Sequence, residues 1–89
     1  MKVNKRFIFR KVANEYLLIP TGEAAMSVKG LIALSESGGI LYQKLIEGCA
    51  LEDLVAALTA EYDVSAEIAR EDVEAFLNQM RQLDILVED

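Results

Sequence analysis

The sequence has no histidine and only one cysteine, Cys49, among its 89 residues. An intrachain disulfide is therefore impossible, and a zinc site built from cysteine and histidine is excluded. A serine or cysteine nucleophile would have no histidine to act as its base. A lone cysteine outside any disulfide is typical of a reducing compartment, so we expect a cytoplasmic protein.

Long apolar runs are also missing. No run approaches the roughly 18 residues that a membrane-spanning helix needs, and the basic residues near the N-terminus are not followed by a continuous apolar stretch. We therefore expect neither a membrane span nor a signal peptide.

Positive charge is scarce. The chain carries 15 acidic and 9 basic residues, a net charge of −6, whereas nucleic-acid-binding domains normally present a basic face. The basic residues that occur early in the chain are Lys2, Lys5, Arg6, Arg10 and Lys11. Two interpretations stay open for them: a local docking patch, or a solvated strand edge that lysine protects from pairing with other chains.

Apolar residues, by contrast, are plentiful and make up 53% of the chain. The length corresponds to a single domain, residues 1–89, with one modest core. Either this core is well filled, or part of the apolar surface contacts a partner such as a second copy or a bound peptide.

The first half of the chain has the pattern of strands. Residues 7–12 (FIFRKV) and 15–20 (EYLLIP) are rich in β-branched and aromatic side chains, and Ala13 and Asn14 between them predict a hairpin turn. Phe7 and Phe9 fall on one side of the first strand, and Pro20 ends the second. Residues 21–30 are expected to form a loop or a poor extra strand.

Residues 31–34 (LIAL) predict the third strand. Its apolar run does not alternate with polar residues, so we expect other elements to cover it on both faces.

Three helices follow. The first is expected to begin at Ser35, a good N-cap, to bury Ile40, Leu41 and Leu45, and to end at Gly48. The apolar spacing from Leu51 to Tyr62 predicts the second, and the third is expected to run from Ser65 to about Leu83. Residues 85–87 are expected to pack back as a tail.

This order of elements predicts the fold class. Three N-terminal β-strands followed by three α-helices indicate an α+β, winged-helix-like domain, with the sheet placed before the helices.

Catalytic signatures are weak. The SESGG segment precedes a helix but lacks both phosphate-binding glycine motifs, and Gly38 and Gly39 are better explained by close packing of the helix on the sheet. Cys49 has no basic neighbour and is interpreted as a small apolar filler. Asp72 either borders a groove or lies on a solvated flank. We predict no catalytic residue, no metal site and no cofactor.

The remaining features indicate an interaction module. A strand edge beside a helix face can accept an extended peptide as an added strand, with side-chain pockets along the helix. Phe76 and Met80 in the last helix suit such pockets; the alternative is that both belong to the core.

Several segments together resemble the PqqD-like family, named for the PQQ-synthesis protein D and also called RiPP recognition elements. They are LLIPTG, LIALSESGGILYQKL, EYDV and EDVEAFLNQMRQL, in this order and spacing. The resemblance covers nearly the whole chain. It departs at Ser35, where the family often has asparagine, and at Leu41 and Tyr42, where many members place tryptophan.

The resemblance implies a three-strand, three-helix fold and a function. Members bind the leader of a ribosomally made precursor peptide, without catalysis, and present it to a modifying enzyme, often a radical-SAM protein. The leader extends the sheet between the third strand and the third helix. The peptide-binding residues carried over onto this chain are Leu31, Ile32, Ala33, Leu34, Asp72, Val73, Phe76, Leu77, Met80 and Arg81, with Arg81 expected to pair with an acidic leader residue.

Two other hypotheses remain beside peptide binding. A winged-helix protein of this kind can bind nucleic acid, although the acidic charge argues against it. The apolar excess is also compatible with a structural subunit that works as a homodimer. A small enzyme is the least supported hypothesis.

Overall fold

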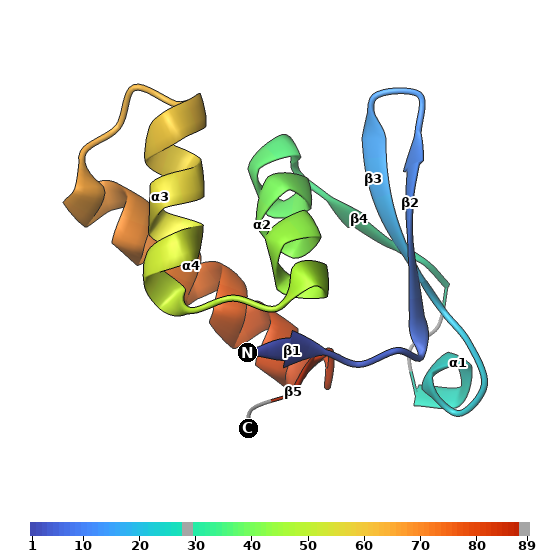
Figure 1. Ribbon diagram of the computed structural model, residues 1–89. Coiled ribbons are helices and arrows are strands. Elements are labelled where there is room, and N and C mark those ends of the chain that lie inside the picture. The colour runs from blue at the N-terminus through green and yellow to red at the C-terminus, as the bar shows by residue number, and fades with distance from the viewer. Residues whose placement is uncertain (28–29, 88–89) are drawn as a thin grey trace.

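The computed structural model describes residues 1–27 and 30–87. A three-stranded sheet lies beside a group of three long helices (Figure 1). In chain order the elements are β1 (Lys2–Val3), β2 (Phe7–Val12), β3 (Glu15–Pro20), α1 (Ala24–Ser27), β4 (Ile32–Leu34), α2 (Glu36–Glu47), α3 (Leu51–Glu61), α4 (Ala66–Gln82) and β5 (Leu86–Val87). This arrangement confirms the predicted α+β class, with strands first and helices after them.

The sheet is antiparallel, with the strand order β2-β3-β4. Phe7 pairs with Pro20 and Val12 with Glu15 in the hairpin, and Tyr16 pairs with Leu34 between β3 and β4. The hairpin therefore has the predicted bounds. Its two-residue turn places Ala13 at φ 57°, a left-handed conformation that is common in such turns but costly for alanine.

One face of the sheet packs on α2 through aromatic rings. The ring centroids of Phe9 and Tyr42 are 5.0 Å apart, and Phe9 stacks on Tyr16 at 5.6 Å. A Cβ atom added to Gly39 would lie only 2.3 Å from Cγ of Tyr16. The predicted close packing of the first turn of this helix against the sheet is thus confirmed.

The other face of the sheet is uncovered within the described part of the chain. Leu31 is 56% exposed, Ala33 is exposed, and Ile8 and Val12 on β2 are 40% and 55% exposed. The prediction that β4 is covered on both faces is therefore wrong. Its apolar run reflects two half-buried side chains, Ile32 and Leu34, interleaved with two exposed ones.

The three predicted helices are present and have the expected N-terminal boundaries. The Ser35 and Ser65 hydroxyls accept hydrogen bonds from the backbone N–H groups of Gly38 and Ile68, and so cap α2 and α4. In α2 the buried residues are Leu41, Leu45 and also Tyr42, whereas Ile40 is only half-buried. Tyr42 is buried where Ile40 was expected to be, because the Tyr42 ring packs against Phe9 on the inner face of the sheet.

Two features differ from the sequence-based prediction. Residues 24–27 form the short helix α1, where a loop or a poor strand was expected. The predicted tail does pack back, and it does so as a strand: β5 pairs with β1, so that Val3 lies opposite Leu86 and the Asn4 amide donates to the Ile85 carbonyl.

The core lies between the three long helices and the inner face of the sheet. Its largest fully buried side chains are Tyr42, Leu18, Leu41, Leu45, Leu54, Met80, Ile85 and Val73. Leu18 comes from the central strand β3, and Met80 and Val73 come from α4. The helix α4 is therefore the element that ties the β5 end of the chain to the rest of the core.

Candidate functional site

The strand β4 is the edge of the three-stranded sheet. It pairs with β3 through residues 32–34, and no strand of residues 1–27 or 30–87 pairs with its other side. Backbone N–H and C=O groups on an open edge are a template for another extended segment. The chain therefore offers a short docking edge directly before α2.

A groove, here called the α2–α4 groove, begins where β4 ends. Its volume is about 340 Å³. The start of α2 contributes one wall, α4 the other, and Leu58 of α3 lies between them. The lining residues are Ser35, Ser37, Gly38, Leu41, Leu58, Asp72, Ala75, Phe76 and Gln79.

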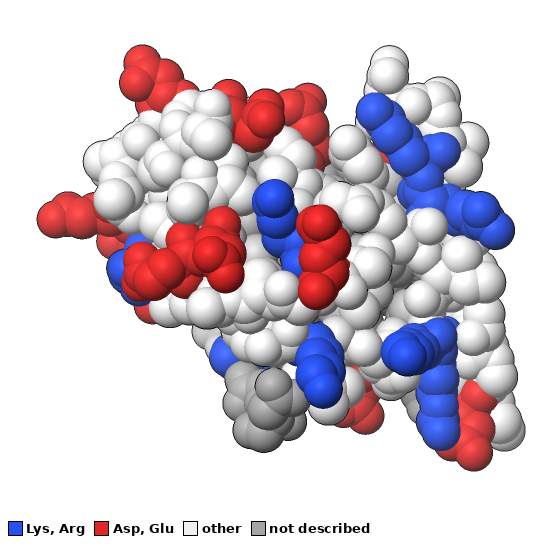
Figure 2. Space-filling view, viewed as in Figure 1, with Lys and Arg blue, Asp and Glu red and all other residues white. Residues whose placement is uncertain are grey.

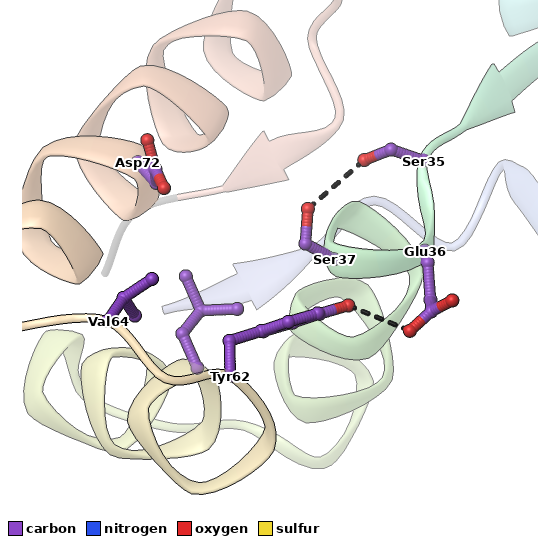
Figure 3. Close-up of a pocket in the computed structure, with 7 residues that line it drawn as sticks. Ser35, Glu36, Ser37, Tyr62, Val64 and Asp72 are labelled. Atoms are coloured by element: carbon purple, nitrogen blue, oxygen red, sulfur yellow. Dashed lines mark hydrogen bonds between the residues drawn. The ribbon is translucent and has the colours of Figure 1, made fainter.

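A second cavity, here called the acidic pocket, continues this groove. It has a volume of about 390 Å³ and shares Ser35, Ser37, Leu58 and Asp72 with the groove. The remaining lining residues are Glu36, Tyr62 and Val64. Figure 3 shows Asp72 on the α4 side and the hydrogen-bonded pair of Tyr62 and Glu36 on the opposite side.

The four residues 31–34, which were predicted to bind a peptide as the third strand, differ in exposure; three of them, Ile32–Leu34, form β4. Leu31 and Ala33 are exposed on the outer face of the sheet, whereas Ile32 and Leu34 are half-buried and pack against the core. Because strand pairing uses backbone groups, an added peptide can hydrogen-bond along this edge whichever way the side chains point.

Most of the predicted residues on α4 face the core. Val73 and Met80 are 0% exposed and Leu77 is 3% exposed. Phe76 is 8% exposed, and its ring edge comes within 3.5 Å of where a Cβ on Gly38 would be, so it forms part of the groove floor. Of these four residues, Phe76 alone lines the groove.

The two charged residues of the predicted set are both exposed. Asp72 lines the groove and the acidic pocket, which favours the groove interpretation over a merely solvated flank. Arg81 does not line either cavity, and its Nη1 donates to Oδ1 of Asn78 at 2.9 Å. The assignment of the ten residues to a peptide site stays a prediction, narrowed by these exposures.

Seven groove residues were not among those predicted to bind a peptide: Ser35, Ser37, Gly38, Leu41, Leu58, Ala75 and Gln79. On α4, the groove residues Asp72, Ala75, Phe76 and Gln79 follow the same spacing as the buried face Val73, Phe76, Leu77 and Met80, one residue earlier. One residue turns an α-helix by about 100°. The row of small and polar residues beside the apolar face of α4 is the sequence signal that indicates Ala75 and Gln79.

Two ionisable side chains that could act as nucleophiles, Cys49 and Tyr62, are poorly suited to that chemistry; Tyr62 lines the acidic pocket, whereas Cys49 lies away from it, in the turn between α2 and α3. Burial, with Asp53 nearby, raises the pKa of the Cys49 thiol, which therefore stays protonated at neutral pH. Burial and the hydrogen bond to Glu36 raise the pKa of Tyr62. In residues 1–27 and 30–87, no group of three or more cysteine, aspartate or glutamate side chains is placed to hold a metal ion.

The fold and the site together define a small winged-helix-like module with an open sheet edge beside a groove. The chain belongs to the PqqD family: residues 17–86 match the family model of coenzyme PQQ synthesis protein D. The resemblance recognised in the sequence is therefore confirmed.

Solved structures share the fold over nearly the whole length. The structure of TbiB1 in complex with the TbiA(beta) leader peptide superposes with a TM-score of 0.81 at 21% identity, covering 100% of this chain and 99% of that one. The lasso peptide synthetase B1 complexed with the leader peptide gives 0.80 at 16% identity, with 98% and 96% covered. Among curated proteins, no sequence matches the chain significantly.

Within the described residues, none of the helices is both long enough and apolar enough to cross a bilayer.

Proposed function

We propose that this protein is a non-catalytic peptide-binding module that holds the leader of a ribosomally made precursor peptide and presents it to a modifying enzyme. The leader adds as a strand to β4 and lays side chains into the α2–α4 groove. The observation that carries this proposal is the open edge of β4 ending at the mouth of that groove.

Membership of the PqqD family supports the proposal, as do the two solved relatives, whose structures each contain a leader peptide. The partner enzyme is proposed to be of the radical-SAM type or another peptide-modifying enzyme, and the product PQQ or a related modified peptide. The setting is proposed to be the cytoplasm, where a protonated lone cysteine is stable.

The contact is small, so we expect modest affinity. A strand of a few residues plus one or two groove side chains corresponds to a dissociation constant of about 1 μM, or roughly −8 kcal/mol. Binding of this strength suits a module that must release the peptide after each round of modification.

The test is an amide NMR titration of the full chain with a synthetic leader, taken from any short open reading frame that is found beside its gene. We expect saturable shifts in residues 31–35 and on the Asp72–Gln79 face of α4. Shifts confined to α3 or to the β1–β5 ladder would contradict the assignment of the site.

A matched pair of variants distinguishes blockage of the groove from the general effect of adding an arginine to the surface. Ala75 lies in the groove, whereas Ala60 is an exposed alanine of α3 outside it. Ala75→Arg is expected to weaken leader binding at least tenfold, about 1.4 kcal/mol, and Ala60→Arg to leave it within twofold. Equal losses in the two variants would place the peptide elsewhere.

A homodimer is the second candidate because the outer face of the sheet is apolar. Ile8, Val12 and Leu31 are 40%, 55% and 56% exposed there, close to Arg10 and Glu15, which carry opposite charges. Such a face is self-complementary and can pack on a second copy. Light scattering of the chain with and without the leader distinguishes a dimer from a monomeric module.

A further inference from the structure

The acidic pocket has walls of mixed chemistry. Leu58 and Val64 provide apolar surface, and the carboxylates of Glu36 and Asp72 lie toward opposite sides of it, as Figure 3 shows. None of its seven lining residues is basic. The cavity therefore combines an apolar surface with two negative charges that no lining residue neutralises.

The Glu36 carboxylate is held in place by a neighbour. The Tyr62 hydroxyl donates a hydrogen bond of 3.0 Å to Oε1 of Glu36, and the raised pKa of Tyr62 keeps that proton on the phenol. This hydrogen bond leaves further acceptor capacity on the carboxylate. Asp72 has no hydrogen bond or ion pair within the described residues, so its oxygens are available to a ligand.

The pocket adjoins the N-terminus of α2, and helix N-termini attract anions. That preference is equivalent to about half a positive charge, whereas the two carboxylates bring two full negative charges. The helices around the pocket make the local charge more negative still, because residues 36–82 carry ten acidic and three basic side chains. The sign of the pocket is therefore negative, and it favours a cation.

We infer that the acidic pocket binds a lysine or arginine side chain of the leader and so sets a sequence preference of the site. The methylene stem lies over Leu58 and Val64, and the charged end reaches Asp72 and Glu36. This inference rests on the proposed function, because it assigns one side chain of the same bound peptide.

The topology predicts where that basic residue lies in the peptide. The strand β4 ends at Leu34, and the next residue, Ser35, lines both the groove and the acidic pocket. A peptide strand paired with Ile32–Leu34 passes the pocket as it leaves the sheet. The basic side chain is therefore expected at the end of the paired segment and not in its middle.

The test needs no knowledge of the natural leader. A phage library of random dodecapeptides is selected on the immobilised full chain, and on the variants Asp72→Asn, Glu36→Gln and Glu71→Gln. Glu71 is the matched control, because it neighbours Asp72 on α4, is exposed and lines neither cavity.

The expected result is enrichment of lysine or arginine at one fixed position beside apolar positions. The preference should be lost with Asp72→Asn, reduced with Glu36→Gln and kept with Glu71→Gln. In a selected peptide, replacing lysine by norleucine should weaken binding to the wild-type chain about five- to tenfold, and less than twofold to Asp72→Asn.

Three outcomes would overturn the inference. Enrichment of apolar or aromatic residues at that position would assign the pocket to an uncharged side chain and leave the peptide site intact. A basic preference that falls equally in all three variants would mean general attraction to an acidic protein. If no peptide is enriched on any form of the chain, the proposed function fails, and the inference fails with it.

Discussion

At the scale of the residue, Gly39 shows how one missing side chain positions a strand and a helix. Because a Cβ there would lie 2.3 Å from the Tyr16 ring, Gly39→Ala is expected to lower the free energy of unfolding by about 1–3 kcal/mol. Gly38→Ala is the control: its nearest contact is Ser35 Oγ at 3.2 Å, and its gain in helix propensity is about 1 kcal/mol.

Urea denaturation of the two glycine variants measures this difference. Gly38→Ala is expected to be as stable as the wild type or slightly more stable. Equal destabilisation of both variants would show that the first turn of α2 resists any side chain, and that the approach of Tyr16 is not the specific cause.

Tyr42 connects burial with pH. Burial raises the pKa of Tyr42 from 10.0 to about 12, so the folded state holds the phenol proton more tightly than the unfolded state does. The corresponding stability is complete below pH 10 and is lost as the pH rises through 10 toward 12. Tyr42→Phe lacks this proton and is expected to lose less stability over that range.

Urea denaturation at pH 8 and at pH 11 checks the prediction, provided that the wild type and Tyr42→Phe are compared at each pH. The Tyr42 hydroxyl has no protein hydrogen-bond partner in the described residues, so the variant is expected to be at least as stable at pH 8. An identical loss of stability in both proteins at pH 11 would exclude Tyr42 as the cause.

At the scale of the element, α4 carries two neighbouring rows of side chains. The buried stripe is Val73, Phe76, Leu77 and Met80, and the groove stripe is Asp72, Ala75, Phe76 and Gln79. Met80, in the buried stripe, is 0% exposed, so Met80→Ala is expected to cost about 2–5 kcal/mol of stability. Gln79, in the groove stripe, is exposed, and Gln79→Ala is expected to change stability by less than about 0.5 kcal/mol while it weakens peptide binding.

Thermal unfolding and a leader titration on the same two variants separate stability from binding. The opposite pattern, with Met80→Ala stable but unable to bind, would mean that the buried stripe opens to receive the peptide. In that case the original assignment of Met80 to the peptide site would be right.

The elements also show what could be predicted from the sequence. The hairpin and the three long helices follow from local signals, namely alternation, apolar spacing and capping serines, and the structure has them where those signals lie. The strands β1 and β5 have two residues each and exist only because the two ends of the chain meet. The groove stripe escaped prediction because periodicity finds the buried face of a helix and not the surface beside it.

At the scale of the whole molecule, charge is divided between the two halves of the fold. Residues 1–34 carry six basic and two acidic side chains, and Figure 2 shows basic side chains along the sheet side and most acidic ones over the helices. A winged-helix nucleic-acid reader needs a basic helix, and α4 is acidic. We therefore expect no salt-resistant shift of duplex DNA in an electrophoretic assay.

The pairing of β1 with β5 joins the first and last described strands of the chain. Asn4 donates from its backbone to the Ile85 carbonyl and from its side chain to the Asp84 carbonyl, and both Ile85 and Leu86 are buried. Deleting residues 1–3 is expected to speed amide exchange in residues 80–87 far more than in the β2–β3 hairpin. Uniform acceleration would instead indicate that the ladder supports the whole fold.

Under the proposed function, the open outer face of the sheet determines which side chains of a bound leader stay accessible. Along a strand added to β4, successive side chains point in opposite directions, so every second one would face α4 and the others would share the outer face with Ala33 and Leu31. The same short peptide segment would then present two alternating sets of side chains, one on each face of the sheet. Under the proposed function, the side chains that face the helices would be bound by this module, and the alternate ones would stay exposed to a modifying enzyme.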